Sequence, residues 1–173
     1  HAAAAIDPRH ADLLFSIGKA YESLGRFEQA KEWFIQAKDE DICPLRILEP
    51  MHKIILNASD QHQIPVVDAR ALFSRWTDDG IPGSEWLVDH VHPTITGHQR
   101  LADELFQAMA AQNLTLAPSH WKKIRNPLWK KHLEALSDAY FEKGMQRLHR
   151  LQIWSRIKSA PSTNSPKHPN SAP

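Results

Sequence analysis

Apolar residues between positions 11 and 44 recur at helical spacing, and this pattern limits the fold more than any other feature of the chain. The first stripe lies on one helical face and consists of Leu14, Ile17, Gly18 and Tyr21. Gly25 and Arg26 suit a tight turn, and a second stripe follows at Phe27, Ala30, Phe34 and Ala37. Small residues at Gly18, Ala30 and Ala37 would let two helices approach closely. We therefore expect a helical hairpin that ends at Pro44.

This hairpin resembles a tetratricopeptide repeat, whose period is about 34 residues. The match covers nearly every signature position, and the alternative is an unrelated helical hairpin. Stacked repeats form concave surfaces that bind peptides, so the resemblance implies a peptide or protein partner. Ala2 to Ile6, followed by Asp7-Pro8, look like the end of a preceding repeat. Because half a hairpin cannot bury its own face, we expect the chain to be the C-terminal piece of a longer protein.

The pattern changes after Pro44. Pro50 suits the first turn of a helix, which is continued by the stripe Met51, Ile54, Ile55 and Ala58. The β-branched run from Ile64 to Asp68 predicts a short buried strand. A helix is expected from Ala69 to Trp76. Another is expected from Thr96 to Asn113, begun by a capping box of Thr96 and Gln99.

The C-terminal part predicts a second, degenerate hairpin. Asn126-Pro127 marks a helix start, and Gly144 is expected to break that helix. The apolar residues of the two predicted helices are Trp129, Leu133, Leu136 and Tyr140, then Leu148, Leu151 and Trp154. Residues 159–173 are rich in serine, proline and asparagine, so we expect them to be disordered.

Asp89 and His92 are the candidate catalytic residues. They lie three apart in a predicted loop, followed by Pro93 and then by a helix. A serine hydrolase needs an imidazole that takes the proton of the nucleophilic hydroxyl. It also needs a carboxylate that holds the other ring nitrogen in the donor tautomer. An Asp-x-x-His turn can supply both groups, because the chain reverses enough for the carboxylate and the ring to meet.

The run DHVHPTITGHQRLADEL, which begins at Asp89, resembles the last motif block of SGNH (GDSL-type) hydrolases. In that block Asp-x-x-His-Pro precedes a glycine and the final helix, and the fit extends over residues 45–113. The resemblance implies that Asp89 orients the ring and that His92 is general base and then general acid. It implies hydrolysis of an ester-type small molecule or a carbohydrate ester, with no metal or organic cofactor. Together with the repeat, it is similar to a bacterial group of SGNH-like proteins.

The family's nucleophile, a serine in a Gly-Asp-Ser block, has no counterpart here. Ser84 lacks a strand–turn–helix context, and five other serines fall in helical patterns: Ser16, Ser23, Ser59, Ser74 and Ser137. We therefore expect the nucleophile to lie upstream of His1 and the 173 residues alone to be inactive. The alternative function is a protein-interaction module that retains a non-catalytic hydrolase remnant.

Two other interpretations of the Asp89–His92 run remain open. His90 and His92 form an H-x-H pattern, and with Asp89 they would suit zinc if the segment were a strand, with His98 six residues beyond His92. Pro93 argues against a regular strand. In the second interpretation Asp89 only caps a turn and His92 bonds a buried carbonyl.

The charge and composition limit the possible partners. The chain has 21 basic and 20 acidic residues and a formal net charge of +1, so nucleic acid is not an expected partner. A basic patch with Trp121 and Trp129, at Lys122, Lys123, Arg125, Lys130 and Lys131, would suit an anionic partner or a solvated helix face. No apolar run approaches the roughly 20 residues of a spanning helix. The compartment stays undecided, since Cys43 is alone.

The sequence thus predicts a mostly α chain with a small β component. A repeat-like hairpin occupies residues 1–44, and the C-terminal part of an α/β, flavodoxin-like domain occupies 45–113. A further helical hairpin occupies 114–158, and a tail occupies 159–173.

Overall fold

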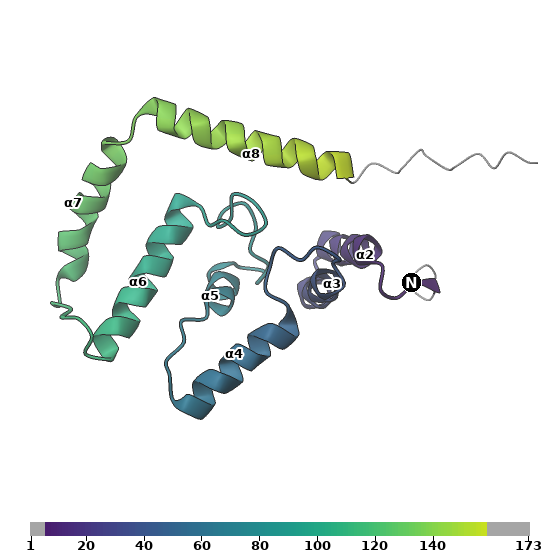
Figure 1. Ribbon diagram of the computed structural model, residues 1–173, viewed down its shortest axis with the longest axis horizontal. Helices are drawn as coiled ribbons and strands as arrows, with labels where there is room; N and C mark the ends of the chain where they lie inside the picture. The colour runs from purple at the N-terminus through teal and green to yellow at the C-terminus, as the bar shows by residue number, and fades with distance from the viewer. Residues whose placement is uncertain (1–5, 159–173) are drawn as a thin grey trace, which may run out of the picture. The chain divides into compact units, whose positions relative to one another are not determined.

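The computed structural model describes residues 6–158, and these are mostly helical, as the sequence predicts (Figure 1). The helices are α2 (Ala11–Ser23), α3 (Phe27–Asp39), α4 (Glu49–His62), α5 (Ala69–Trp76), α6 (Ile95–Ala111), α7 (Trp121–Glu134) and α8 (Asp138–Lys158). The chain divides into two compact units, one ending at Pro118 and the other beginning at Ser119. The candidate site lies in the first unit.

Helices α2 and α3 form the predicted hairpin, and they are the most closely packed pair of helices in the described residues. His10 begins α2, where its Nδ1 accepts a hydrogen bond from the backbone N–H of Leu13 at 3.3 Å. Gly25 turns the chain with a φ of 68°, a left-handed conformation that suits glycine. Leu14 and Ala30 are fully buried between the helices.

Gly18 sets how closely the two helices can pack. A Cβ placed on it would lie 2.6 Å from two ring carbons of Phe34 and 3.3 Å from the carbonyl oxygen of Ala30. Gly18→Ala should therefore destabilise the hairpin by about 1–3 kcal/mol, although alanine is the better helix former. Thermal unfolding followed by circular dichroism measures the effect. Gly144→Ala is the matched control, because a Cβ there meets nothing within 4 Å, and it should raise helix stability. Equal effects of the two changes would contradict close packing at Gly18.

The strand predicted from Ile64 to Asp68 is wrong. In the described residues the one β-type pairing is an isolated bridge between Leu87 and Pro93. Both ends of the run are engaged elsewhere: the N–H of Ile64 donates to the carbonyl of Ser59 at 2.9 Å, and the Asp68 carboxylate caps α5 by accepting from the N–H of Ala71 at 3.1 Å. Only residues 65–67 remain, and Pro65 has no N–H to donate. The small β component is therefore limited to that bridge.

The predicted start of α6 is off by two residues. Thr94, not Thr96, is the N-cap, and its hydroxyl accepts a hydrogen bond from the N–H of Gly97 at 3.0 Å. Thr94 follows Pro93 in an extended conformation, which an N-cap requires. The capping box of Thr96 and Gln99 is thus not formed.

The predicted boundaries in the second unit are also wrong. Pro127 lies inside α7, and α8 continues through Gly144. The chain breaks between the two helices instead, at residues 135–137. A helical glycine costs only about 1 kcal/mol relative to alanine, which a long helix tolerates. The predictions for residues 1–5 and for the tail, residues 159–173, concern parts of the chain outside the described residues.

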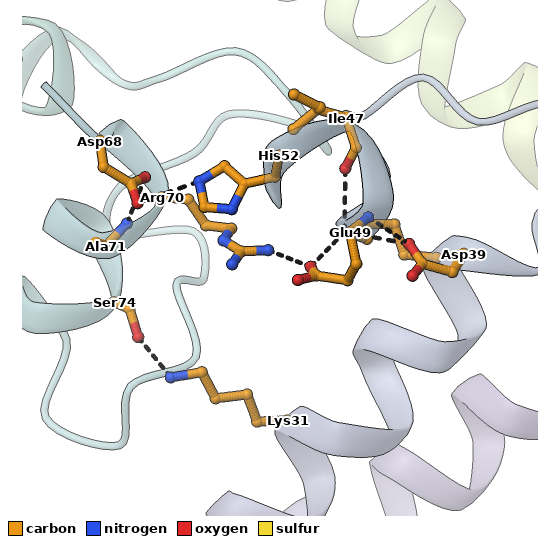
Figure 2. Close-up of polar contacts among 10 residues, drawn as sticks. Lys31, Asp39, Ile47, Glu49, His52, Asp68, Arg70, Ala71 and Ser74 are labelled. Atoms are coloured by element: carbon orange, nitrogen blue, oxygen red, sulfur yellow. Dashed lines mark hydrogen bonds and ion pairs between the residues drawn. The ribbon is translucent and has the colours of Figure 1, made fainter. Parts of the chain in front are cut away.

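A cluster of polar contacts joins α3, α4 and α5 within the first unit (Figure 2). Glu49 is its centre: it accepts hydrogen bonds from Lys38 at 2.8 Å and from Arg70. Burial opposes ionisation of Glu49, but the two cations outweigh it and lower the pKa of this carboxyl group. Lys31 of α3 also donates to the hydroxyl of Ser74 of α5 at 2.8 Å. The hairpin is thereby attached to the part of the chain that carries the candidate site.

Candidate functional site

The segment from Trp86 to Thr94 folds back on itself and forms a closed loop. The N–H of Val88 donates to the carbonyl of His92 at 2.8 Å, and the N–H of Thr94 donates to the carbonyl of Trp86 at 2.7 Å. The bridge between Leu87 and Pro93 lies between these two bonds. The loop therefore holds its own shape and presents Asp89 and His92 near its tip.

Asp89 uses both carboxylate oxygens inside this loop. Its Oδ1 accepts the backbone N–H groups of Val91 and His92, each at 2.8 Å. Its Oδ2 lies 2.7 Å from Nδ1 of the His92 ring. The structure thus brings together the two side chains that the sequence singled out, and one oxygen fixes the loop while the other fixes the ring.

The two side chains differ in their exposure to solvent. The Asp89 side chain is 11% exposed and the His92 side chain is 67% exposed. No hydrogen bond to Nε2 of His92 is formed by any residue in the described part of the chain. A carboxylate at Nδ1 favours the tautomer with the proton on Nδ1, which leaves the Nε2 lone pair open to accept a proton.

The electrostatics of the loop favour an ionised Asp89. Burial raises the pKa of a carboxyl group, but three hydrogen bonds act against it: those from the N–H groups of Val91 and His92 and that from the His92 ring. Together they lower the pKa of Asp89 to about 2 from an ordinary value of 3.8. Asp89 is therefore a carboxylate at neutral pH, as an orienting acid must be.

This shift predicts a pH dependence. Since the pKa of Asp89 is lower in the folded loop than in the unfolded chain, the ionised group stabilises the loop above about pH 4. This contribution to stability is lost as the pH falls from 4 toward 2. Carboxyl carbon NMR shifts, recorded through this range, should give an Asp89 midpoint well below the ordinary value of 3.8. A midpoint near 4 would show that the loop does not hold the carboxylate as described.

The floor of the loop consists of Gly97, which is the glycine of the motif block, and of aromatic and cationic residues to which the sequence analysis gave no role in the site. Gly97, in the first turn of α6, packs beneath the loop: a Cβ there would lie 2.8 Å from the carbonyl oxygen of Trp86. The Trp86 ring contacts Phe73 and Trp76 of α5, with centroids 6.2 and 5.5 Å away. Arg100 lies over both tryptophan rings, 4.6 Å from Trp76 and 5.0 Å from Trp86. The aromatic residues before the Asp-x-x-His run and the glycine after it were the features of the sequence that could have indicated this support for the loop.

The two other interpretations of the loop can now be compared with its geometry. In the part of the chain that the structure describes, no group of three His, Cys, Asp or Glu side chains is placed to hold a metal ion. His90 and His98 are both exposed. The first part of the capping interpretation is confirmed, because Asp89 does cap the turn. The His92 ring, however, is exposed and contacts the carboxylate, not a buried carbonyl.

No described serine donates to the His92 ring. Ser16 and Ser23 donate to carbonyls of their own helix, and Ser59 donates to the carbonyl of Ile64. Ser74 donates to the carbonyl of Gly80 at 2.7 Å while accepting from Lys31. Ser84, the remaining loop candidate, is exposed. The imidazole thus contacts the Asp89 carboxylate, and no described serine contacts it.

A second Asp–His contact exists that the sequence analysis missed, because its members are sixteen residues apart. Nε2 of His52 lies 3.1 Å from Oδ2 of Asp68, and Figure 2 shows the ring pointing from α4 toward the start of α5. The His52 side chain is only 11% exposed, and Asp68 is already the cap of α5. This pair joins α4 to α5. Of the two histidines that contact an aspartate, His92 is the one exposed to solvent.

Comparisons of the chain with protein-family models, with curated proteins and with solved structures found no match. None of the helices in the described residues is both long and apolar enough to cross a membrane. Function must therefore be argued from the geometry of the loop.

Proposed function

We propose that the Asp89–His92 loop is the acid–base part of an SGNH-like acyl hydrolase. In this proposal His92 takes the proton of a serine hydroxyl through Nε2 and returns it to the leaving alkoxide. Asp89 holds the donor tautomer and stabilises the imidazolium. The observation that carries the proposal is the 2.7 Å contact between Nδ1 and Oδ2, with Nε2 facing solvent.

The nucleophile comes from polypeptide outside these 173 residues. Four of the described serines donate to backbone carbonyls: Ser16, Ser23, Ser59 and Ser74. Ser137 accepts a hydrogen bond from the backbone N–H of Tyr140 at 3.3 Å. Residues 45–113 are then the closing part of the hydrolase domain, and the α2–α3 hairpin is a tetratricopeptide-type repeat attached to it. The reaction is hydrolysis of an ester or removal of an acyl group, and it needs no metal.

The test compares the 173-residue chain with the longest natural polypeptide that contains it. Hydrolysis of p-nitrophenyl acetate is measured for both. The longer protein should be active, and the chain alone should not exceed the rate of free imidazole. Activity of the chain alone would place the nucleophile within it, and Ser84→Ala would then be the first variant to assay. An inactive longer protein, across short and long acyl esters, would overturn the proposal.

A second candidate is a protein-interaction module. It is favoured by one observation: on the closely packed α2–α3 hairpin, the Phe15 side chain remains half exposed although its ring contacts Phe34. An exposed aromatic side chain on a repeat can anchor a peptide. In that case Phe15→Ala would weaken partner binding and His92→Ala would not.

A further inference from the structure

The near-neutral net charge of the chain conceals a strong separation of charge. Residues 1–118, the first unit, carry ten lysines and arginines against seventeen carboxylates. Residues 119–173, the second unit, carry eleven against three. The second unit taken by itself is therefore strongly basic, although the chain as a whole is nearly neutral.

Helix α7 combines this charge with exposed apolar side chains. Ile124 is 49% exposed and Leu128 is 60% exposed, and they lie one turn apart on the helix. Lys123 and Lys130 lie about two turns apart on the other side. None of the residues of α7 is buried. Exposed apolar side chains and exposed cations therefore lie side by side along α7.

Its tryptophans are covered by cations. Arg125 lies over the rings of Trp121 and Trp129, 5.1 and 3.9 Å from their centroids, and Lys122 lies 5.5 Å from the centroid of Trp121. Such stacks place a cation beside an amphipathic ring, an arrangement suited to the boundary between water and lipid.

Helix α8 repeats this combination. Five of its large apolar side chains are exposed: Tyr140, Phe141, Met145, Leu151 and Ile153. Lys143, Arg147 and Arg150 lie among or just after them in the sequence. Exposed apolar side chains therefore occur beside cations on both helices of the unit.

We propose that α7 and α8 bind the surface of an anionic lipid bilayer, lying in the interface without crossing it. The cations meet the lipid phosphates, and the exposed apolar side chains enter the acyl boundary. Nucleic acid would account for the lysines and arginines, but it offers nothing to Ile124, Leu128 and Met145. The inference is independent of the proposed hydrolase activity, because it uses no residue of the Asp89–His92 loop.

Vesicle flotation tests the proposal with the 173-residue chain. Vesicles of phosphatidylcholine alone are compared with vesicles that contain roughly 30% phosphatidylglycerol, at about 0.15 M salt. The chain should bind the anionic vesicles at least about tenfold more tightly. The triple change Lys122→Glu, Lys123→Glu and Lys130→Glu should remove most of this binding. The matched control makes the same charge change at three exposed positions of the first unit, Arg46, Lys53 and Arg75, and should bind nearly as wild type.

A second pair of variants separates lipid from other anions. Ile124→Ser with Leu128→Ser keeps every charge and should weaken vesicle binding about tenfold, whereas Ile54→Ser with Ile55→Ser on α4 should not. Circular dichroism checks that the helices persist. Equal binding to neutral and anionic vesicles, or none to either, overturns the proposal. So does an unchanged affinity of the Ile124/Leu128 variant together with displacement by a short RNA, which would make nucleic acid the partner.

Discussion

Under the proposed function, replacing His92 with alanine should lower kcat for p-nitrophenyl acetate hydrolysis by about 10³-fold to 10⁴-fold, measured in the longest natural polypeptide that contains these 173 residues. The loss is large because no other described imidazole is both exposed and hydrogen-bonded to a carboxylate. The fold should be unaffected, since the ring is 67% exposed and the loop is closed by backbone hydrogen bonds. The KM should change little, because the ring acts on the proton and does not hold the acyl group.

Asp89→Asn tests the same geometry without removing volume. An asparagine can keep Oδ1 on the N–H groups of Val91 and His92, so the loop should survive. The amide nitrogen then takes the place of Oδ2 and presents a donor to Nδ1. This favours the tautomer with its proton on Nε2. In that tautomer Nε2 has no free lone pair and cannot take the serine proton, so kcat should fall by about 10³-fold. The proton NMR spectrum of the ring reports which nitrogen carries the proton.

Matched controls exist for both changes. His90→Ala removes an exposed imidazole from the same loop. Asp79→Asn alters another carboxylate that caps a turn, since Asp79 accepts from the N–H of Ile81 at 2.9 Å. Both controls should leave kcat within about twofold of wild type. If His92→Ala retained wild-type activity, or if His90→Ala were equally damaging, His92 would not be the general base.

Sequence periodicity predicted those parts of the chain that depend on local spacing. The α2–α3 hairpin follows from its two apolar stripes, and α5 begins and ends at the expected residues, Ala69 and Trp76. The contact between Asp89 and His92 follows from a three-residue spacing, which one turn can close by itself.

The wrong predictions have local physical causes. At two places one set of local hydrogen bonds formed in preference to another, and at a third place a glycine was too weak a helix breaker to end the helix. The run from Ile64 to Asp68 has strand composition, yet Ser59 and the cap of α5 take its ends. Thr94 and Thr96 are both suitable caps, and the extended residue after Pro93 is the one used. Gly144 is a weak breaker that a long helix passes through. The polar contacts of Glu49 and the pair of His52 with Asp68 join residues far apart in sequence, so no spacing rule could find them.

Gly97→Ala should lower both the stability of the fold and the activity of the Asp89–His92 loop. In most helices this change is favourable by up to about 1 kcal/mol. Here the added Cβ would lie 2.8 Å from the carbonyl oxygen of Trp86, 3.1 Å from Cβ of Pro93 and 3.3 Å from the ring of Phe73. The first of these atoms belongs to the backbone and accepts the hydrogen bond from Thr94 that closes the loop. Relief therefore requires the loop to move, at a cost of about 1–3 kcal/mol.

Gly83→Ala is the control. It creates an equally close contact, but with a side-chain atom that can move and not with a backbone atom that cannot. Its Cβ would also meet an atom at 2.8 Å, but that atom is Oε2 of Glu85. This carboxylate ends an exposed side chain, which can rotate away at the cost of the hydrogen bond that its Oε1 accepts from the N–H of Gly83 at 3.0 Å. The expected result is a lower Tm and faster amide exchange at Val88 and Thr94 in Gly97→Ala, and near wild-type values in Gly83→Ala. Turnover should fall in the first variant alone, because a displaced loop carries Asp89 and His92 with it. Equal exchange rates in both variants would mean that α6 does not support the loop and that its shape comes from its internal hydrogen bonds alone.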